Sequence, residues 1–131
     1  MSKYLSFFAF IALISAPATA KVTGNDLLYQ CGPVETLVSG QASKLSDKES
    51  SQAEICLARI DGYKDGILLG HWAYGTLGTA AEKGVCIPDG ANAVQLTSVI
   101  VKFLRKNPER RHNDAYIEMM AALISAYPCG E

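Results

Sequence analysis

The chain has 131 residues, in which 12 lysine and arginine side chains face 13 aspartate and glutamate side chains, and its formal net charge is -1. This length suits one domain, and the balanced charge provides no basic field to attract DNA or RNA, so we expect no nucleic-acid partner. With 49% hydrophobic and 19% charged residues, the composition is that of an ordered globular protein and excludes a disordered chain.

The first twenty residues have the pattern of a secretory signal. A lysine at position 3 precedes a nearly unbroken apolar run at positions 5–14, and small residues occupy positions 18–20. The run is shorter than the roughly 20 apolar residues of a membrane-spanning helix, so a retained membrane anchor is the less favoured alternative. We expect residues 1–20 to be a signal peptide that is cleaved after Ala20. Residues 21–131 are then a single exported domain with no membrane association.

Two helices are predicted in the first half of this domain, over residues 26–38 and 47–69. The polar, glycine-containing sequence that begins at Ser39 is typical of a turn between them. Along the second helix, Ala58, Gly62, Gly66 and Gly70 recur every four residues and form a ridge of small residues. Because a glycine costs roughly 1 kcal/mol in a helix interior, we expect another segment to approach this ridge closely. A groove for a partner segment is the alternative.

Residues 70–84 are expected to form a long connection after the second helix. This segment contains His71, Trp72 and Tyr74 together with several glycines. Connections carry binding residues more often than regular elements do, and Trp and Tyr are common anchors of protein interfaces. We therefore consider these three residues candidates for partner binding. Simple packing of the two aromatic side chains on the helices is the alternative.

The second half of the domain predicts two more helices, which fold back on each other. Asn92, with Gln95 three residues later, forms a variant capping box and predicts the start of a helix whose apolar residues recur with helical period. Asn107-Pro108 ends that helix, since proline cannot continue the backbone ladder. After a short helical turn, Asn113 is expected to cap a last helix that ends before Pro128. The predicted fold class is therefore all-α, a small bundle of four to five helices.

All four cysteines lie in the exported part, which favours two disulfides over metal ligation. No CxxC motif is present and the chain has only two histidines, so we expect no metal site. Two helices that fold back bring together positions equally far from their turn. The midpoint of Cys86 and Cys129 falls at Asn107-Pro108, and that of Cys31 and Cys56 falls in the turn-like sequence after Ser39. These positions predict the pairs Cys31–Cys56 and Cys86–Cys129, each worth ~3 to 4 kcal/mol.

The sequence contains no recognisable catalytic motif. It lacks a Ser-His-Asp order, GxSxG, a phosphate-binding loop and HExxH, and oxidised cysteines cannot act as nucleophiles. Asp61 and Asp65 lie one helical turn apart and could mimic a carboxylate pair for acid-base chemistry, but such a pair is more often a solvated helix face. We expect a protein without enzymatic activity, catalytic residues or cofactors.

Short motifs follow one another in a distinctive order along the chain. They are Ile55–Gly66 around Cys56, Val85–Gly90 with Cys-Ile-Pro, Gln95–Leu104, Asn107–His112 with Asn-Pro-Glu, and Ala126–Cys129 with Pro-Cys. In this order and spacing they resemble the Rap/Tai family of type VI secretion immunity proteins. The resemblance implies a small disulfide-bonded helical protein of the periplasm, often a homodimer. It also implies that the partner is a papain-like peptidoglycan amidase effector, which the protein inhibits by covering its substrate cleft.

The leading hypothesis is therefore an immunity protein of the periplasm. Its expected contact surface is the exposed side of residues 70–84, with His71, Trp72 and Tyr74 as anchors and Arg110 and Arg111 as candidate charge partners. A periplasmic stress chaperone is the alternative, and it predicts many unfolded clients whose affinity rises at low pH. A small hydrolase is a third class, and it lacks a credible nucleophile and base.

Overall fold

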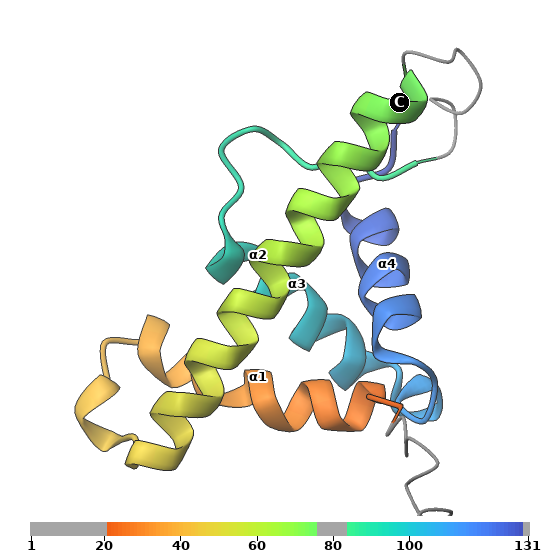
Figure 1. The fold of residues 1–131 in the computed structure, drawn as a ribbon. Helices are drawn as coiled ribbons and strands as arrows, with labels where there is room; N and C mark the ends of the chain where they lie inside the picture. Colours follow the sequence, from red (N-terminus) through yellow and green to blue (C-terminus); the bar gives the residue numbers. More distant parts are fainter. Residues whose placement is uncertain (1–20, 76–83, 130–131) are drawn as a thin grey trace, which may run out of the picture.

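The computed structural model describes residues 21–75 and 84–129 and is all-α (Figure 1). Its helices are α1 (Gly24–Val38), α2 (Asp47–Gly75), α3 (Ala93–Lys106) and α4 (Ala115–Ala126), with two 3₁₀ turns, η1 (Ala42–Lys44) and η2 (Pro108–Arg110). The predicted small helical bundle is confirmed. The expected signal peptide, residues 1–20, lies outside the described residues, as do residues 76–83 of the expected connection and residues 130–131.

Helix α1 begins two residues earlier than predicted because Thr23 caps it. The Thr23 side chain accepts a hydrogen bond from the backbone N–H of Asp26, and the Asp26 carboxylate accepts one from the Thr23 N–H at 2.8 Å. This reciprocal capping box satisfies two donors that would otherwise lack helical partners. The bond from the Thr23 backbone, followed by that from its hydroxyl, lowers the pKa of Asp26.

The start of α1 is held against the corner between α3 and α4. The backbone N–H groups of Gly24 and Asn25 donate to the carbonyls of Asn113 and Arg111 at 3.0 and 2.8 Å, and Ala115 donates to the Val22 carbonyl at 2.9 Å. A Cβ on Gly24 would lie 3.1 Å from the Arg111 backbone, so glycine permits this close approach. The first described residues are therefore part of the folded body.

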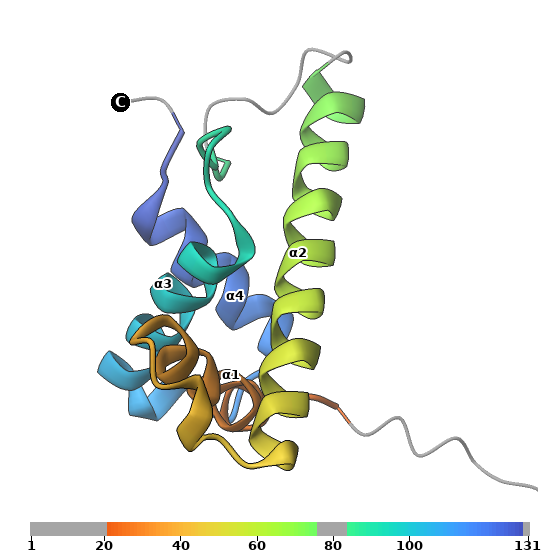
Figure 2. The same ribbon diagram turned by 90° about the vertical axis from the view of Figure 1, so that its left-hand side faces the viewer.

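Helix α2 runs to Gly75, six residues beyond the predicted end at Leu69. The predicted connection was wrong over this stretch, because no proline interrupts the helical ladder before Gly75 and single glycines do not break a helix. A helix of 29 residues is roughly 43 Å long at 1.5 Å per residue, about twice the length of α1. The last part of α2 consequently extends away from the other helices (Figures 1 and 2).

Among the described residues, the glycines of the ridge on α2 have no close neighbour, contrary to our prediction. A Cβ built on Gly62, Gly66 or Gly70 would meet no atom within 4 Å. The side of α2 that packs on the bundle is a different one, marked by the buried residues Ile60 and Ile67. Glycine spacing alone did not show on which side of the helix the ridge would lie.

Helices α3 and α4 are capped by the residues that precede them. Asn92 caps α3 as predicted, since its Oδ1 accepts from the Gln95 N–H at 3.0 Å. The Gln95 side chain donates to the Tyr127 hydroxyl at 3.4 Å and does not complete the predicted capping box. The cap of α4 is Asp114 and not the predicted Asn113, because the Asp114 carboxylate accepts from the Tyr116 N–H at 2.9 Å. Asn113 instead points its amide at Glu118, so the neighbouring acidic side chain takes the capping position.

The core lies where the four helices meet. All four contribute side chains to it, and the largest apolar ones that are fully buried are Leu27, Ile60, Leu96, Ile100, Leu104, Met119 and Leu123. Burial of one such side chain stabilises the fold by roughly 1.5–3 kcal/mol. This core supports the whole of α1, α3 and α4 but only the part of α2 up to Ile67.

Both predicted disulfides are confirmed, and their surroundings differ. Cys31 and Cys56 join α1 to α2 inside the core, and both are fully buried. Cys86 and Cys129 join the segment before α3 to the end of the chain, and Cys86 is exposed. An antiparallel bridge between Val85 and Pro128 accompanies this second disulfide.

Within the described residues, no helix combines the length and apolar character needed to cross a membrane.

Candidate partner-binding surface

The last two turns of α2 expose three large apolar side chains. Leu68 is 44% exposed, Leu69 is 66% exposed and Trp72 is 72% exposed. From Leu68 to Ala73, the part of α2 after Ile67 whose burial is described, no residue is buried, so these side chains lie beyond the buried contact of Ile67 with the core. The predicted anchor Trp72 is therefore presented to solvent on a helix and not on a flexible connection. Tyr74 lies on the same helix, two residues further on.

Two acidic residues lie on the same side of α2 as these apolar side chains. Spacings of three, four, seven and eleven residues return to one face of a helix. Asp61 lies four residues before Asp65, and Leu68, Leu69 and Trp72 lie three, four and seven residues after it. We call this set of five residues the distal face of α2. Sequence reasoning missed Leu68 and Leu69 as site residues, although their helical spacing from the acids was the signal that could have revealed them.

Lys64 partly balances the acidic end of the distal face. Its ammonium lies 2.8 Å from an Asp61 carboxylate oxygen and 4.0 Å from one of Asp65. The bond to Asp61 raises the pKa of Lys64. Two carboxylates therefore share one cation, and the Asp65 side chain remains 69% exposed. The aspartates are a solvated pair and not a carboxylate dyad arranged for acid-base catalysis.

His71 faces a different direction from Trp72. A Cβ on Gly84 would lie 3.0 Å from the His71 Nε2 atom and 3.7 Å from the Cys129 sulfur, so His71 packs on Gly84 beside the second disulfide. His71 follows Leu68 by three residues, so its position on the helix borders the distal face, but its imidazole is directed to Gly84 and the second disulfide. His71 helps to seat the segment before α3 against α2. Its role as a contact residue remains a prediction.

The middle of α2, around Arg59 and Tyr63, is anchored by polar contacts to two other helices. The Arg59 guanidinium donates to the Gln30 side chain of α1 at 2.6 Å, and the Tyr63 hydroxyl donates to the Tyr116 carbonyl of α4 at 3.0 Å. The rings of Tyr63 and Tyr116 are 5.8 Å apart, and burial raises the pKa of Tyr63. Together with the Cys31–Cys56 disulfide, these contacts fix the direction in which α2 leaves the bundle.

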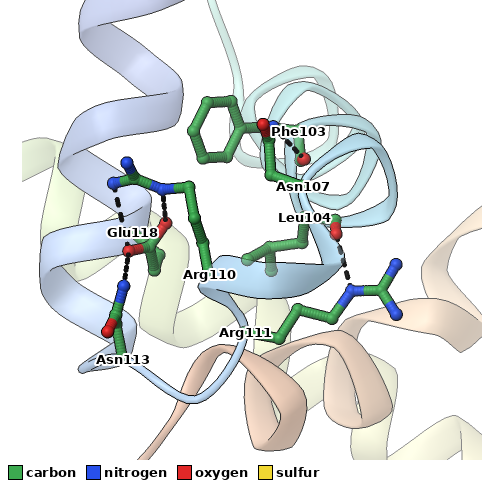
Figure 3. Close-up of polar contacts among 7 residues, drawn as sticks. All are labelled: Phe103, Leu104, Asn107, Arg110, Arg111, Asn113 and Glu118. Atoms are coloured by element: carbon green, nitrogen blue, oxygen red, sulfur yellow. Dashed lines mark hydrogen bonds and ion pairs between the residues drawn. The ribbon is translucent and has the colours of Figure 1, made fainter.

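Arg110, the first candidate charge partner, holds a buried carboxylate inside the protein (Figure 3). Its guanidinium makes two hydrogen bonds to Glu118, at 2.8 and 3.1 Å, and the Asn113 amide adds a third at 2.9 Å. Glu118 is completely buried and is the one charged residue of α4. Burial raises the pKa of Glu118, but the bonds from Arg110 and Asn113 outweigh that effect and keep the pKa below its ordinary value.

Arg111, the second candidate charge partner, caps the end of α3. Its Nε atom donates to the Leu104 carbonyl at 2.6 Å (Figure 3), and its Nη2 atom donates to the Arg105 carbonyl at 3.0 Å. These bonds satisfy acceptors that a helix end leaves open. The corner with both arginines lies at the opposite end of the molecule from the last turns of α2 (Figure 1). The structure therefore does not bring the five predicted contact residues together into one site.

An open polar hollow lies between α1 and the start of α2. Its volume is about 540 Å³, and its lining includes Tyr29, Pro33, Lys48 and Gln52. The Lys48 ammonium lies 5.8 Å from the centre of the Tyr29 ring, and its hydrogen bond lowers the pKa of the Tyr29 phenol.

In the ranges 21–75 and 84–129 no group of three or more His, Cys, Asp or Glu side chains could hold a metal ion. All four cysteines are in disulfides, so none offers a thiol for catalysis.

The family model of the Rap1a immunity proteins matches residues 23–129, which include all four helices and both disulfides. No curated protein and no solved structure matches the chain.

Proposed function

Because the chain belongs to the Rap1a immunity protein family, we propose that it protects its cell by inhibiting a peptidoglycan amidase effector of type VI secretion in the periplasm. Membership in this family indicates a role in immunity against a type VI effector and hence a protein partner. The inhibition is steric: the bound immunity protein covers the substrate cleft of a papain-like amidase. Immunity proteins of this kind are generally not enzymes.

The periplasmic location is supported by the disulfides and by the sequence before the fold. Two disulfides without a free cysteine are typical of an oxidising compartment, and together with the family they indicate an exported protein. The pattern of residues 1–20 supports a signal peptide cleaved after Ala20. The first described residues, bonded to the α3–α4 corner, then lie directly at the new N-terminus.

The observation that carries a binding function is the exposed apolar end of α2. Trp72 and Leu69 are each more than 60% exposed on a helix that extends past its own core. Contiguous apolar exposure of this kind marks protein interaction sites. A homodimer is part of the proposal, and the exposed α4 residues Tyr116, Ile117 and Ile124 support it as a second apolar surface.

The proposal is tested by titrating the oxidised protein into recombinant papain-like amidases from type VI effectors and measuring release of peptide stems from peptidoglycan. We expect the activity of one amidase to fall to zero at a stoichiometric ratio near neutral pH. Light scattering of the free protein and of the complex then gives the stoichiometry. Suppression of aggregation of many unfolded clients at low pH, without inhibition of any amidase, would replace the proposal with the chaperone alternative.

A further inference from the structure

The distal face of α2 has a chemistry that specifies its partner. Resting on the proposed function, we infer that Asp61, Asp65, Leu68, Leu69 and Trp72 dock into an apolar socket of the amidase effector that is bordered on one side by basic side chains. This face differs from the contact surface that the sequence predicts, because it retains Trp72 but not His71 or the two arginines.

The apolar part of the face lies near the end of α2 and is presented on a continuous helix. Leu68, Leu69 and Trp72 fall within two turns of a continuous helix, and the stretch from Gly66 to Gly75 contains no Asp, Glu, Lys or Arg. A tryptophan on a regular helix loses little conformational freedom on binding, and Trp is enriched among residues that dominate interface energies. A side chain that is 72% exposed before binding has a large area to bury in a socket.

The acidic part of the face lies nearer the bundle. Asp61 and Asp65 have exposed side chains, and Lys64 compensates one of their two charges. Lys64 pairs more closely with Asp61, so the charge along the face changes from negative at Asp65 to neutral at Trp72. A partner surface that matches this order has a basic rim next to an apolar pocket, because like charges opposite the aspartates would be repelled.

The position of α2 is fixed before any partner binds. Its middle part is joined to α1 by the Cys31–Cys56 disulfide and to α4 by the hydrogen bond from the Tyr63 hydroxyl. Its last turns contact Gly84 through His71. Such preorganisation reduces the ordering cost of association. The extension of α2 also gives a convex element that can enter a cleft, whereas the arginine corner is occupied by internal hydrogen bonds.

The first test compares two exposed aromatic residues. Trp72→Ala and the control Tyr29→Ala remove side chains that are 72% and 61% exposed, on the distal face and on α1 respectively. Binding to the amidase that the wild-type protein inhibits is measured by calorimetry. We expect roughly 30-fold weaker binding for Trp72→Ala and less than threefold for Tyr29→Ala. Circular dichroism and a thiol assay confirm that each variant is folded and oxidised.

The second test addresses the acidic end. Asp65→Lys and the control Glu109→Lys change the net charge equally, but only Asp65 lies on the distal face. We expect Asp65→Lys to lower the association rate about tenfold at low salt and to flatten its salt dependence, with little effect from Glu109→Lys.

The outcomes separate this inference from the proposed function. Suppose that the wild-type protein inhibits an amidase, while Trp72→Ala binds it as tightly as its control and Asp65→Lys binds it as fast as its control. The distal face is then not the docking surface, and the inference is wrong although the proposed function stands. If the wild-type protein inhibits no type VI amidase, the proposed function fails and the inference fails with it.

Discussion

Removing the disulfide with the shorter loop should destabilise the protein more than removing the one with the longer loop, which is the reverse of what loop length alone predicts. Cys31–Cys56 spans 25 residues and Cys86–Cys129 spans 43. The chain-entropy relation gives ~3.5 kcal/mol for the shorter loop and ~4 kcal/mol for the longer one. On entropy alone, the double variant Cys86→Ala/Cys129→Ala is therefore the more destabilised, by about 0.5 kcal/mol.

Burial reverses this order. Cys31 and Cys56 are both fully buried, whereas Cys86 is exposed. Replacing a buried cysteine by alanine leaves a cavity the size of one sulfur atom, which costs about 1 kcal/mol for each residue. The double variant Cys31→Ala/Cys56→Ala should then lose ~5.5 kcal/mol of unfolding free energy in total, about 1.5 kcal/mol more than the other pair.

Urea unfolding at low temperature, monitored by circular dichroism, measures both losses. The oxidised state of the remaining disulfide is checked by a thiol assay, and the urea dependence of the unfolding free energy reports any change in the unfolded chain. Equal losses, or a larger loss for Cys86→Ala/Cys129→Ala, would refute the idea that core burial outweighs loop length in this fold.

Three further substitutions test other features. Glu118→Gln should cost about 1–3 kcal/mol at pH 7, because it leaves Arg110 without its charged partner. The pKa of Glu118 in the folded protein lies below its ordinary value of 4.5, so the stabilisation by its carboxylate is present above pH 4.5 and is lost as the pH falls through the folded pKa. In urea unfolding, the difference in unfolding free energy between wild type and Glu118→Gln should therefore shrink over that pH range. Gly66→Ala should raise the midpoint of thermal unfolding through a gain of about 0.4–1 kcal/mol, and a lower midpoint would mean that a neighbour does contact the ridge. Thr23→Ala should lose about 1 kcal/mol in urea unfolding, with faster amide exchange in the first turn of α1 as its local signature.

The sequence was most informative where one local rule acts alone. The cap at Asn92 and the break at Asn107-Pro108 depend on neighbouring residues only. The two disulfide pairs followed from two local turns, one at Asn107-Pro108 and one after Ser39. The choice between Asn113 and Asp114 as a cap could not be made locally, because it depends on the buried carboxylate of Glu118 drawing the Asn113 amide away.

The candidate surface was only partly predictable for the same reason. Trp72 was identified as a candidate from its residue type, but glycines and aromatics between His71 and Gly75 resemble a loop as much as a helix. Whether that stretch is helical depends on continuation of α2 past its last core contact at Ile67, which no spacing encodes. The arginines were predicted from their charge, yet their donors are used by Glu118 and by the end of α3.

Because the first described residues are hydrogen-bonded to the α3–α4 corner, they determine at which end the protein can be labelled or tethered to a solid support. The start of α1 is hydrogen-bonded to the α3–α4 corner. It lies at the end of the molecule far from the last turns of α2 (Figure 1). Cys129, by contrast, lies next to His71 near those turns. A tether fused ahead of Lys21 would therefore lie at the end of the molecule far from the last turns of α2, whereas one attached near Cys129 would lie closer to them.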